Sequence, residues 1–185
     1  VEAAANIDAV AFDKTGTLTR GETQLTDVFV RDGLADESLT SDELLSLAAS
    51  VQARSEHHLA RATVSEAEAR ALDVPDARRF QSEAGKGVRA DVDDGTIHIG
   101  NRSYVETVLE DAAIEGLDPG LDRLRTLEAE GKTSVLVARE HAGNATVLGW
   151  LAFTDTVRPG AAEMIEDLRS LGVEHIVMLT GDNER

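Results

Sequence analysis

Apolar positions fall in short runs separated by turns that contain Gly, Asp or Pro, and their spacing predicts a mixture of strands and helices. The run "IDAVAF" (7–12) is apolar enough for a buried parallel strand, and "HIVML" (175–179) predicts another. Two alternating runs within 87–100, joined around Asp94 and Gly95, predict a β-hairpin. Further strands are expected over 25–30, 133–140 and 145–153.

Helical spacing is clearest in "RPGAAEMIEDLRSLG" (158–172). Pro159 lies near the first turn of this expected helix, and Gly172 suits the position just after its end. A capping box, with Thr40 as N-cap and Glu43 three residues later, predicts a second helix. Two more helices are expected over 58–71 and 121–131.

The first and last strands end alike, because polar residues follow each of them. Asp13 follows the strand at 7–12, and Thr180 follows the strand at 175–179. In parallel α/β sheets, ligands bind at the edge formed by the carboxyl ends of the strands. If both loops serve one site, residues 23–145 are an inserted α+β domain, and residues 1–22 and 146–185 form the α/β domain around it.

Composition narrows the possible partners. Hydrophobic residues make up 42% of the chain and charged residues 29%, which is usual for a globular protein. The net charge is −17, from 35 acidic and 18 basic residues, and lysine is scarce. This acidity argues against a nucleic-acid partner and resembles the surfaces of proteins from high-salt environments. With no cysteine, no signal segment and no apolar run of about 20 residues, the chain is expected to be soluble.

The stretch after the first strand carries the strongest chemical signal. Asp13 is ionised at pH 7 and can attack a phosphorus centre, provided that a cation such as Mg²⁺ offsets the charge repulsion. Hydroxyl and backbone N–H groups of 15–17 and of Thr180 and Gly181 could hold the transferred oxygens. Thr15 stands where a phosphatase of this design would carry an acid, so an aspartyl phosphate here should persist. Taken alone, the stretch could also be a simple Asp-Lys-Thr-Gly turn.

Three motifs in order carry a resemblance to a known family. "DKTGTLT" (13–19), "DTVRP" (155–159) and "MLTGDN" (178–183) resemble the phosphorylation, hinge-side and second phosphorylation-domain motifs of P-type ATPases. The resemblance implies a haloacid-dehalogenase-like parallel sheet with an inserted nucleotide-binding domain. It implies catalytic roles for Asp13, Lys14, Thr15, Thr180, Gly181 and Asp182, with Mg²⁺ at Asp13 and Thr15.

The intervening residues resemble the heavy-metal-transporting branch of that family. "SEHHLARA" (55–62) is similar to its SEHPLA motif, "GKG" (85–87) to its glycine pair and "IGN" (99–101) to a further nucleotide contact. The resemblance implies an ATP site formed by Gln52, Glu56, His57, Gly85, Gly87, Gly100 and Asn101. Gln52 replaces the usual glutamate, so it keeps an acceptor for an adenine amino group but loses the charge. The motif's proline is His58 here.

The resemblance implies that ATP phosphorylates Asp13 and that this reaction drives metal transport by membrane helices outside the chain. The chain is then the cytoplasmic part of an integral membrane protein, and the cargo is a zinc, cadmium or copper-class cation, with the zinc and cadmium group favoured. The GDGxND motif is absent, so we expect an incomplete phosphorylation domain with low or no turnover by itself. A soluble phosphatase and a non-catalytic nucleotide-binding module remain alternatives.

Two other sequence patterns do not have the residue spacing that a P-loop or a metal site requires. "GKT" (131–133) is similar to the end of a P-loop, but the glycine required five residues earlier is Thr126. His57 and His58 are adjacent, so on a helix they would point about 100° apart, and no third metal ligand is evident.

Overall fold

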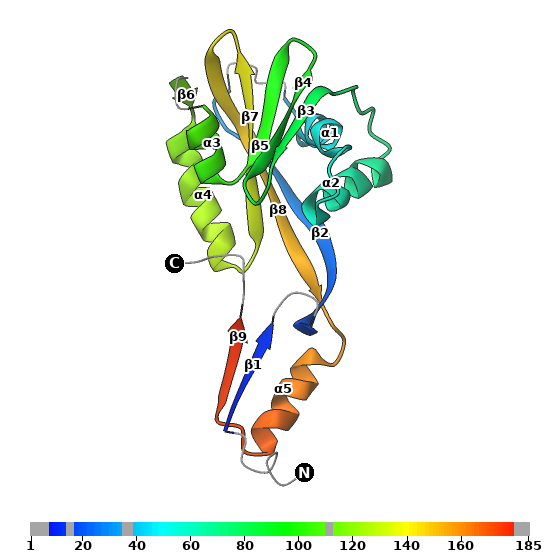
Figure 1. Cartoon of the computed structure of the whole chain (residues 1–185), viewed down its shortest axis with the longest axis vertical. Coiled ribbons are helices and arrows are strands. Elements are labelled where there is room, and N and C mark those ends of the chain that lie inside the picture. Colours follow the sequence, from blue (N-terminus) through cyan, green and yellow to red (C-terminus); the bar gives the residue numbers. More distant parts are fainter. Residues whose placement is uncertain (1–7, 14–16, 35–38, 110–112, 180–185) are drawn as a thin grey trace. The chain divides into compact units, whose positions relative to one another are not determined.

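The chain forms two compact units, which a computed structural model describes for residues 8–13, 17–34, 39–109 and 113–179 (Figure 1). Unit 1 comprises Val1–Thr23 and Asp155–Arg185, and unit 2 comprises Gln24–Thr154. The inserted segment expected over 23–145 therefore differs from unit 2 at its second boundary. Strand β8 (Asn144–Val157) pairs with β7 (Thr133–His141) as far as Phe153, which keeps residues 146–154 in unit 2.

Unit 2 is built on a mixed sheet with the strand order β2-β8-β7-β5-β4-β3, and β6 pairs with β8 in parallel. The pairs from β3 to β8 along this order are antiparallel. The remaining strands are β2 (Thr19–Val30), β3 (Arg78–Glu83), β4 (Gly87–Val92), β5 (Gly95–Gly100) and β6 (Ala113–Glu115). The predicted hairpin over 87–100 is confirmed as β4 and β5, whereas β3 was not expected from the sequence.

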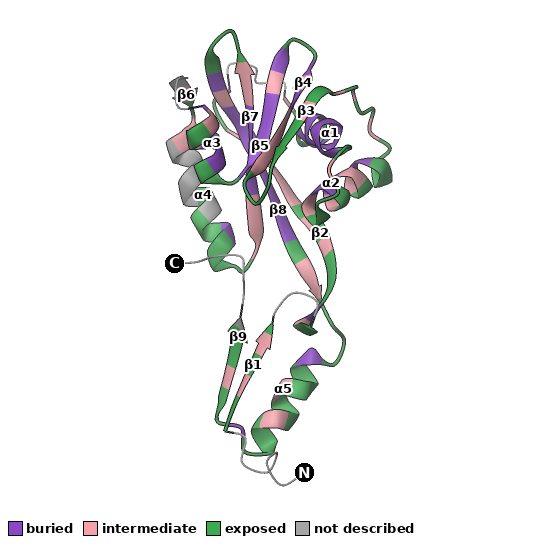
Figure 2. Cartoon of the chain, viewed as in Figure 1, coloured by how far each residue is buried: buried purple, intermediate pink, exposed green. Residues whose placement is uncertain are grey.

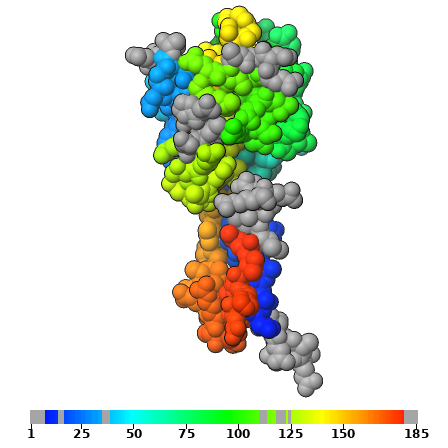
Figure 3. Space-filling view, turned by 90° about the vertical axis from the view of Figure 1, so that its left-hand side faces the viewer, coloured from blue at the N-terminus to red at the C-terminus, as the bar shows by residue number. Residues whose placement is uncertain are grey.

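Helices cover both faces of this sheet (Figure 1). Helices α1 (Ser41–Gln52) and α2 (His58–Ala69) pack together, and α1 lies on β4 and β5. Helices α3 (Arg102–Val108) and α4 (Leu117–Ala129) lie on the opposite face, against β5 and β7, and form the outer surface there (Figure 3). The predicted capping box is confirmed, because the Thr40 hydroxyl accepts from the Glu43 N–H and the Glu43 carboxylate accepts from the Thr40 N–H.

Two apolar clusters follow from this layering (Figure 2). One lies between α1 and the sheet and includes the fully buried Leu44, Val51, Ile97 and Phe153. The other lies under α3 and α4 and centres on residues 104, 105, 136, 147 and 150. Burying a Leu, Ile, Val or Phe side chain contributes about 1.5–3 kcal/mol, so these clusters provide most of the stability of unit 2.

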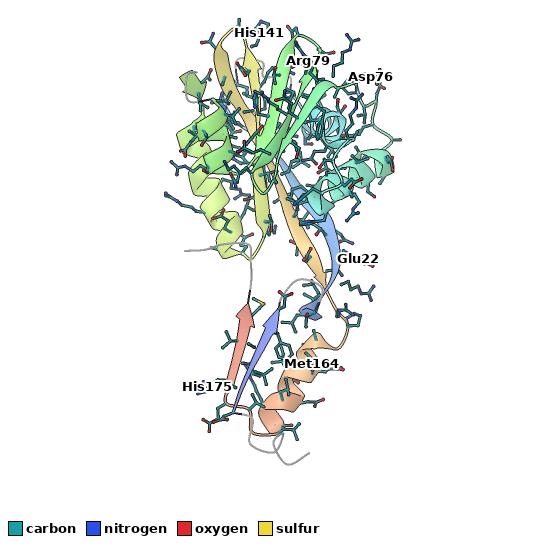
Figure 4. The ribbon with its side chains drawn as sticks, in the orientation of Figure 1. Glu22, Asp76, Arg79, His141, Met164 and His175 are labelled. Carbon is teal, nitrogen blue, oxygen red and sulfur yellow. The ribbon has the colours of Figure 1, made fainter. Side chains whose placement is uncertain are left out.

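Unit 1 contains a two-stranded parallel sheet of β1 (Ala9–Asp13) and β9 (His175–Leu179), and helix α5 (Ala161–Ser170) precedes β9 in the chain. Both strands were predicted, but the expectation that they are buried is wrong. Residues of β1 alternate between exposed and half-buried, and Val177 and Met178 of β9 are 50% and 55% exposed. Among the described residues of unit 1, only α5 is available to cover this sheet, and Met164 of α5 is itself exposed (Figure 4).

Within the described part of the chain, the helices are all too short or too polar to cross a membrane.

Candidate functional site

Asp13 and Leu179 are the last residues of β1 and β9, and they are register partners in the parallel pair. The two strands therefore end at the same edge of the sheet, and each continues in the sequence into one of the polar motifs. Asp13 is exposed at that edge, and so is Thr17. Lys14, Thr15, Thr180, Gly181 and Asp182 lie outside the described residues. The strand ends are arranged as the sequence pattern predicted.

Asp155 and Arg158, from the DTVRP segment, hold the residues that follow the Asp13 motif. The Asp155 carboxylate accepts hydrogen bonds from the Thr23 hydroxyl at 2.5 Å and the Thr19 hydroxyl at 3.4 Å. Arg158 Nε donates to the Thr19 carbonyl at 2.9 Å, and the Arg158 N–H donates to the Leu18 carbonyl at 2.9 Å. The two distant parts of the sequence that make up unit 1 are thus joined through these polar groups, which sequence reasoning did not assign.

The proposed metal ligands are Asp13 and Thr15, of which only Asp13 is described. Among residues 8–13, 17–34, 39–109 and 113–179, no group of three or more His, Cys, Asp or Glu side chains is placed to hold a metal ion. Asp13 offers an exposed carboxylate, which is an oxygen ligand of the kind that Mg²⁺ prefers. A one-carboxylate site with water and phosphate oxygens completing the shell is typical of Mg²⁺.

The proposed nucleotide contacts come from three junctions of unit 2. Gln52 is the last residue of α1, and Glu56 and His57 lie in the link to α2. Gly85 lies in the turn between β3 and β4, where its φ of +72° is a conformation that glycine adopts without strain. Gly87 begins β4, Gly100 ends β5, and Asn101 is the N-cap of α3.

The core under α1 brings these junctions together. Val51 and Ile99 are buried members of one cluster, and Leu59 and Val88 pack against it. Gln52, Gly100 and Gly87 are the sequence neighbours of Val51, Ile99 and Val88, and His57 precedes Leu59 by two residues. The same apolar contacts that fold unit 2 therefore gather the candidate binding residues.

Gln52 is a buried amide without a partner for its oxygen. Its side chain is only 5% exposed, and Oε1 has no hydrogen-bond partner. An unsatisfied buried acceptor costs about 1–3 kcal/mol, so such a group in a native protein calls for an explanation. A ligand with a donor group, such as an exocyclic amine, would satisfy this oxygen.

His57 starts helix α2. It is the N-cap, and its Nδ1 accepts from the Leu59 N–H at 3.3 Å. In the neutral ring this bond assigns the proton to Nε2. The ring of His58 lies alongside, with 4.2 Å between ring centroids. Glu56 is exposed, as are both histidines. A histidine cap thus replaces the rigid start that a proline would give.

Gly87 and Gly100 are register partners on β4 and β5, and both leave room for Tyr104. A Cβ at Gly87 would lie 2.6 Å from Cδ1 of Tyr104, and a Cβ at Gly100 would lie 2.4 Å from the same atom. The space that side chains at these positions would need is taken by the Tyr104 ring and by the carbonyl oxygens of Ile99 and Lys86. Sequence reasoning missed Tyr104, although an aromatic residue four positions after a glycine, on a helix that begins there, was an available signal.

Comparison with known proteins agrees with this architecture. A family profile described as haloacid dehalogenase-like hydrolase matches residues 7–185, and the chain belongs to that family. Within it, the chain matches a region of heavy-metal P-type ATPases. It is 38% identical over 192 residues to the probable copper-exporting P-type ATPase V of Mycobacterium tuberculosis, covering 100% of this chain and 22% of that protein. It is 34% identical over 181 residues to a probable cadmium-transporting ATPase of Staphylococcus aureus, covering 96% of this chain and 23% of that protein.

Solved structures give the same result. A zinc-transporting PIB-type ATPase in the E2.Pi state matches with a TM-score of 0.70 and 36% identity, over 100% of this chain and 27% of that one. The catalytic domain of the CPx-ATPase CopB-B matches with a TM-score of 0.63 and 25% identity, over 99% of this chain and 57% of that one. The chain spans about 22% of the length of the first of these curated relatives.

Proposed function

We propose that this chain is the ATP-binding and aspartyl-phosphorylation region of a heavy-metal cation-transporting P-type ATPase. The observation that carries the proposal is the register pair of Asp13 and Leu179, which ends both motif-bearing strands at one sheet edge. The seven-residue motif that begins at Asp13 supports a phosphoryl-accepting role for this edge. Unit 1 is then the phosphorylation domain and unit 2 the nucleotide-binding domain.

Asp13 is the nucleophile in this proposal. A carboxylate oxygen of Asp13 forms a bond to the γ-phosphorus of ATP while the bond from that phosphorus to the bridging oxygen breaks, and ADP leaves with the electron pair. Asp13 and Thr15 would hold Mg²⁺, which when bound reduces the repulsion between the carboxylate and the phosphoryl group. Lys14, Thr15, Thr180, Gly181 and Asp182 are proposed to surround the transferred group, and Thr15 cannot act as the acid that rapid hydrolysis needs.

ATP binding is assigned to unit 2. The buried Oε1 of Gln52 can accept from the adenine amino group, and His57 offers a ring for stacking or hydrogen bonding. Gly85, Gly87, Gly100 and Asn101 supply backbone from the sheet edge, and Glu56 is exposed beside His57. A match to the isolated N-domain of a copper-transporting P-type ATPase, over 70% of this chain and 98% of that one with a TM-score of 0.52, supports this division.

The proposed cargo is a heavy-metal cation. Relatives named for copper export and for cadmium transport are 38% and 34% identical to the chain, and a related structure is that of a zinc transporter. These values do not separate the three metals, so the preference for zinc or cadmium stays a prediction. The metal would pass through membrane helices that belong to the transporter and that this chain would drive from the cytoplasmic side.

Phosphoenzyme formation tests the proposal. Membranes that carry the full-length transporter are incubated with γ-labelled ATP and Mg²⁺, and acid-stable, hydroxylamine-sensitive label is measured. Label is expected in the wild type and should be absent in Asp13→Asn. Label that persists in Asp13→Asn would overturn the assignment of the nucleophile.

Two further measurements on the folded 185-residue chain address the alternatives. Calorimetry should detect ATP binding at high salt, and its absence would refute the nucleotide-binding role. Rapid hydrolysis of p-nitrophenyl phosphate without a stable phosphoenzyme would instead support a soluble phosphatase.

A further inference from the structure

Gly87 and Gly100 face each other across β4 and β5, so their missing side chains would project from the same face of the sheet. The Tyr104 ring occupies the space on that face, within 2.6 Å and 2.4 Å of the positions that the two Cβ atoms would take. Carbon atoms do not approach this closely, so the ring and a side chain at either position exclude each other. The glycine pair and Tyr104 therefore form one packing unit.

The opposite face at the same strands carries the candidate nucleotide contacts. Val88 and Ile99, the neighbours of the two glycines, alternate to that face and pack in the core beneath α1 with Val51. Helix α3, which carries Tyr104, lies across the sheet from α1 and α2 (Figure 1). Tyr104 thus supports the glycine backbone from behind, on the side away from Gln52 and His57.

The tyrosine itself is held firmly. It is 3% exposed, and its backbone N–H donates to Asn101 Oδ1 at 2.8 Å, which caps α3. The Asn101 N–H in turn donates to the Lys86 carbonyl at 3.1 Å, which ties the start of α3 to the turn before Gly87. Burial raises the pKa of Tyr104 to about 12, so the phenol is neutral at physiological pH. The ring, and not a charge, makes the contact.

We propose that Tyr104 is a positioning residue for the nucleotide site, because its ring fixes the backbone of Gly87 and Gly100 in the conformation that receives ATP. This inference rests on the proposed nucleotide-binding function of unit 2. Without the ring, two glycines at the ends of paired strands would have open space on one side and more conformational freedom. Binding would then include the entropic cost of ordering them.

Calorimetric titration of the 185-residue chain with ATP, on variants shown to be folded, tests the inference. Tyr104→Phe keeps the ring and should bind ATP like the wild type. Tyr104→Ala should bind about tenfold more weakly, and Tyr104→Leu, which retains an apolar side chain, covers the case in which the alanine variant does not fold. Leu109→Ala is the matched control, because Leu109 is 2% exposed in the same cluster, whereas the atoms nearest to the missing Cβ positions belong to Tyr104, Ile99 and Lys86. It should lose stability and keep its ATP affinity.

A double-mutant cycle supplies a second readout. Gly87→Ala should destabilise the wild type strongly and the Tyr104→Ala variant less, because the clash with the ring is gone while the clash with the Ile99 carbonyl oxygen, 2.6 Å from the added Cβ, remains. If the wild type binds ATP and Tyr104→Ala or Tyr104→Leu binds it equally well, the positioning role is wrong while the proposed function stands. If the folded wild type does not bind ATP, both the proposed nucleotide-binding function and the positioning role of Tyr104 are wrong.

Discussion

Lys132 Nζ lies 2.7 Å from Asp27 Oδ2, so the lysine of the Gly-Lys-Thr sequence is ion-paired with strand β2. The hydrogen bond from Lys132 lowers the pKa of Asp27, and the same bond raises the pKa of Lys132. Neither side chain is fully buried, since they are 24% and 29% exposed. The pair is therefore a contact within unit 2 that accounts for Lys132 without a P-loop.

The first prediction concerns this pair. Lys132→Met and Asp27→Asn should each destabilise unit 2, and a double-mutant cycle should show a favourable coupling between the two side chains. The Asp27 contribution is present above its unfolded pKa of about 3.9 and is lost as the pH falls through its lowered folded value. Lys132→Met should leave ATP affinity unchanged in calorimetry. A large loss of affinity would revive a phosphate-binding role.

Gln52 provides a case in which stability and binding should move in opposite directions. Gln52→Leu removes a buried acceptor that has no partner, so the free energy of unfolding should rise by about 1 kcal/mol or stay level. ATP affinity should fall about tenfold through loss of the hydrogen bond to adenine. Gln24→Leu, at an exposed position of β2, is the control for the substitution itself. Unchanged ATP affinity in Gln52→Leu would contradict the assignment.

His57→Ala should weaken ATP binding more than His58→Ala, because only His57 is proposed to contact the base. His57→Ala also removes the cap of α2 and should cost about 1 kcal/mol of stability. His57→Asn separates the two effects, since asparagine is a good N-cap but lacks the ring. The His57→Asn variant should be as stable as the wild type but should bind ATP as weakly as His57→Ala does. Equal ATP affinities of His57→Ala and His58→Ala would contradict the proposed contact between His57 and the base.

His98 should make the stability of unit 2 depend on pH. It is fully buried in β5, with Nε2 3.1 Å from Glu140 Oε2, and burial lowers its pKa despite the opposing effect of Glu140. The unfolded chain then binds a proton at about pH 6.5 that the folded chain does not, so stability is lost as the pH falls below that value.

Chemical denaturation between pH 8 and pH 5, values chosen to bracket the histidine pKa of about 6.5, measures this effect. The loss should be smaller in His98→Gln, which has no group to titrate there. It should be larger in Glu140→Gln, because the carboxylate that favours the charged ring is gone. A wild-type curve that is flat over this range would contradict the prediction.

Salt should stabilise the chain. With a net charge of −17, the folded surface repels itself, and the Debye length falls from about 8 Å at 0.15 M to about 3 Å at 1 M. The melting temperature should therefore rise on addition of NaCl. Replacing exposed carboxylates, as in Glu68→Gln with Asp73→Asn, should raise the melting temperature most at low salt. A melting temperature independent of NaCl would argue against the high-salt interpretation of the composition.

Local elements were predictable where the signal is local. The capping box at Thr40 needs only residues three positions apart, and it is present in the structure. A polar turn between the expected strands is predicted at Gly143 and Asn144, and the structure places it one residue earlier, at Ala142 and Gly143, which both have positive φ as a type I′ hairpin loop requires. The strand β3 was missed because "RRFQSE" is an edge strand with little apolar alternation.

Burial was predicted less well than secondary structure. The apolar sequences of β1 and β9 indicated buried strands, yet Val177 and Met178 of β9 are 50% and 55% exposed. Conversely, Gln52 and His98 are polar residues that the fold buries to 5% and 0% exposure. The exposure of a strand depends on which other elements pack against it, and the hydrophobicity pattern of the strand does not reveal those elements.

The sequence by itself determined the chemistry of the Asp13 motif, the order of most strands and helices, and the family to which the chain belongs. Only the tertiary structure decided that Asp13 ends in register with Leu179, that Gln52 Oε1 is buried without a partner, and that Tyr104 packs behind Gly87 and Gly100. The physical reason is the sequence separation over which the relevant interactions act. Helix caps and turns depend on neighbours a few residues away, whereas strand register and side-chain packing depend on contacts between residues far apart in the chain.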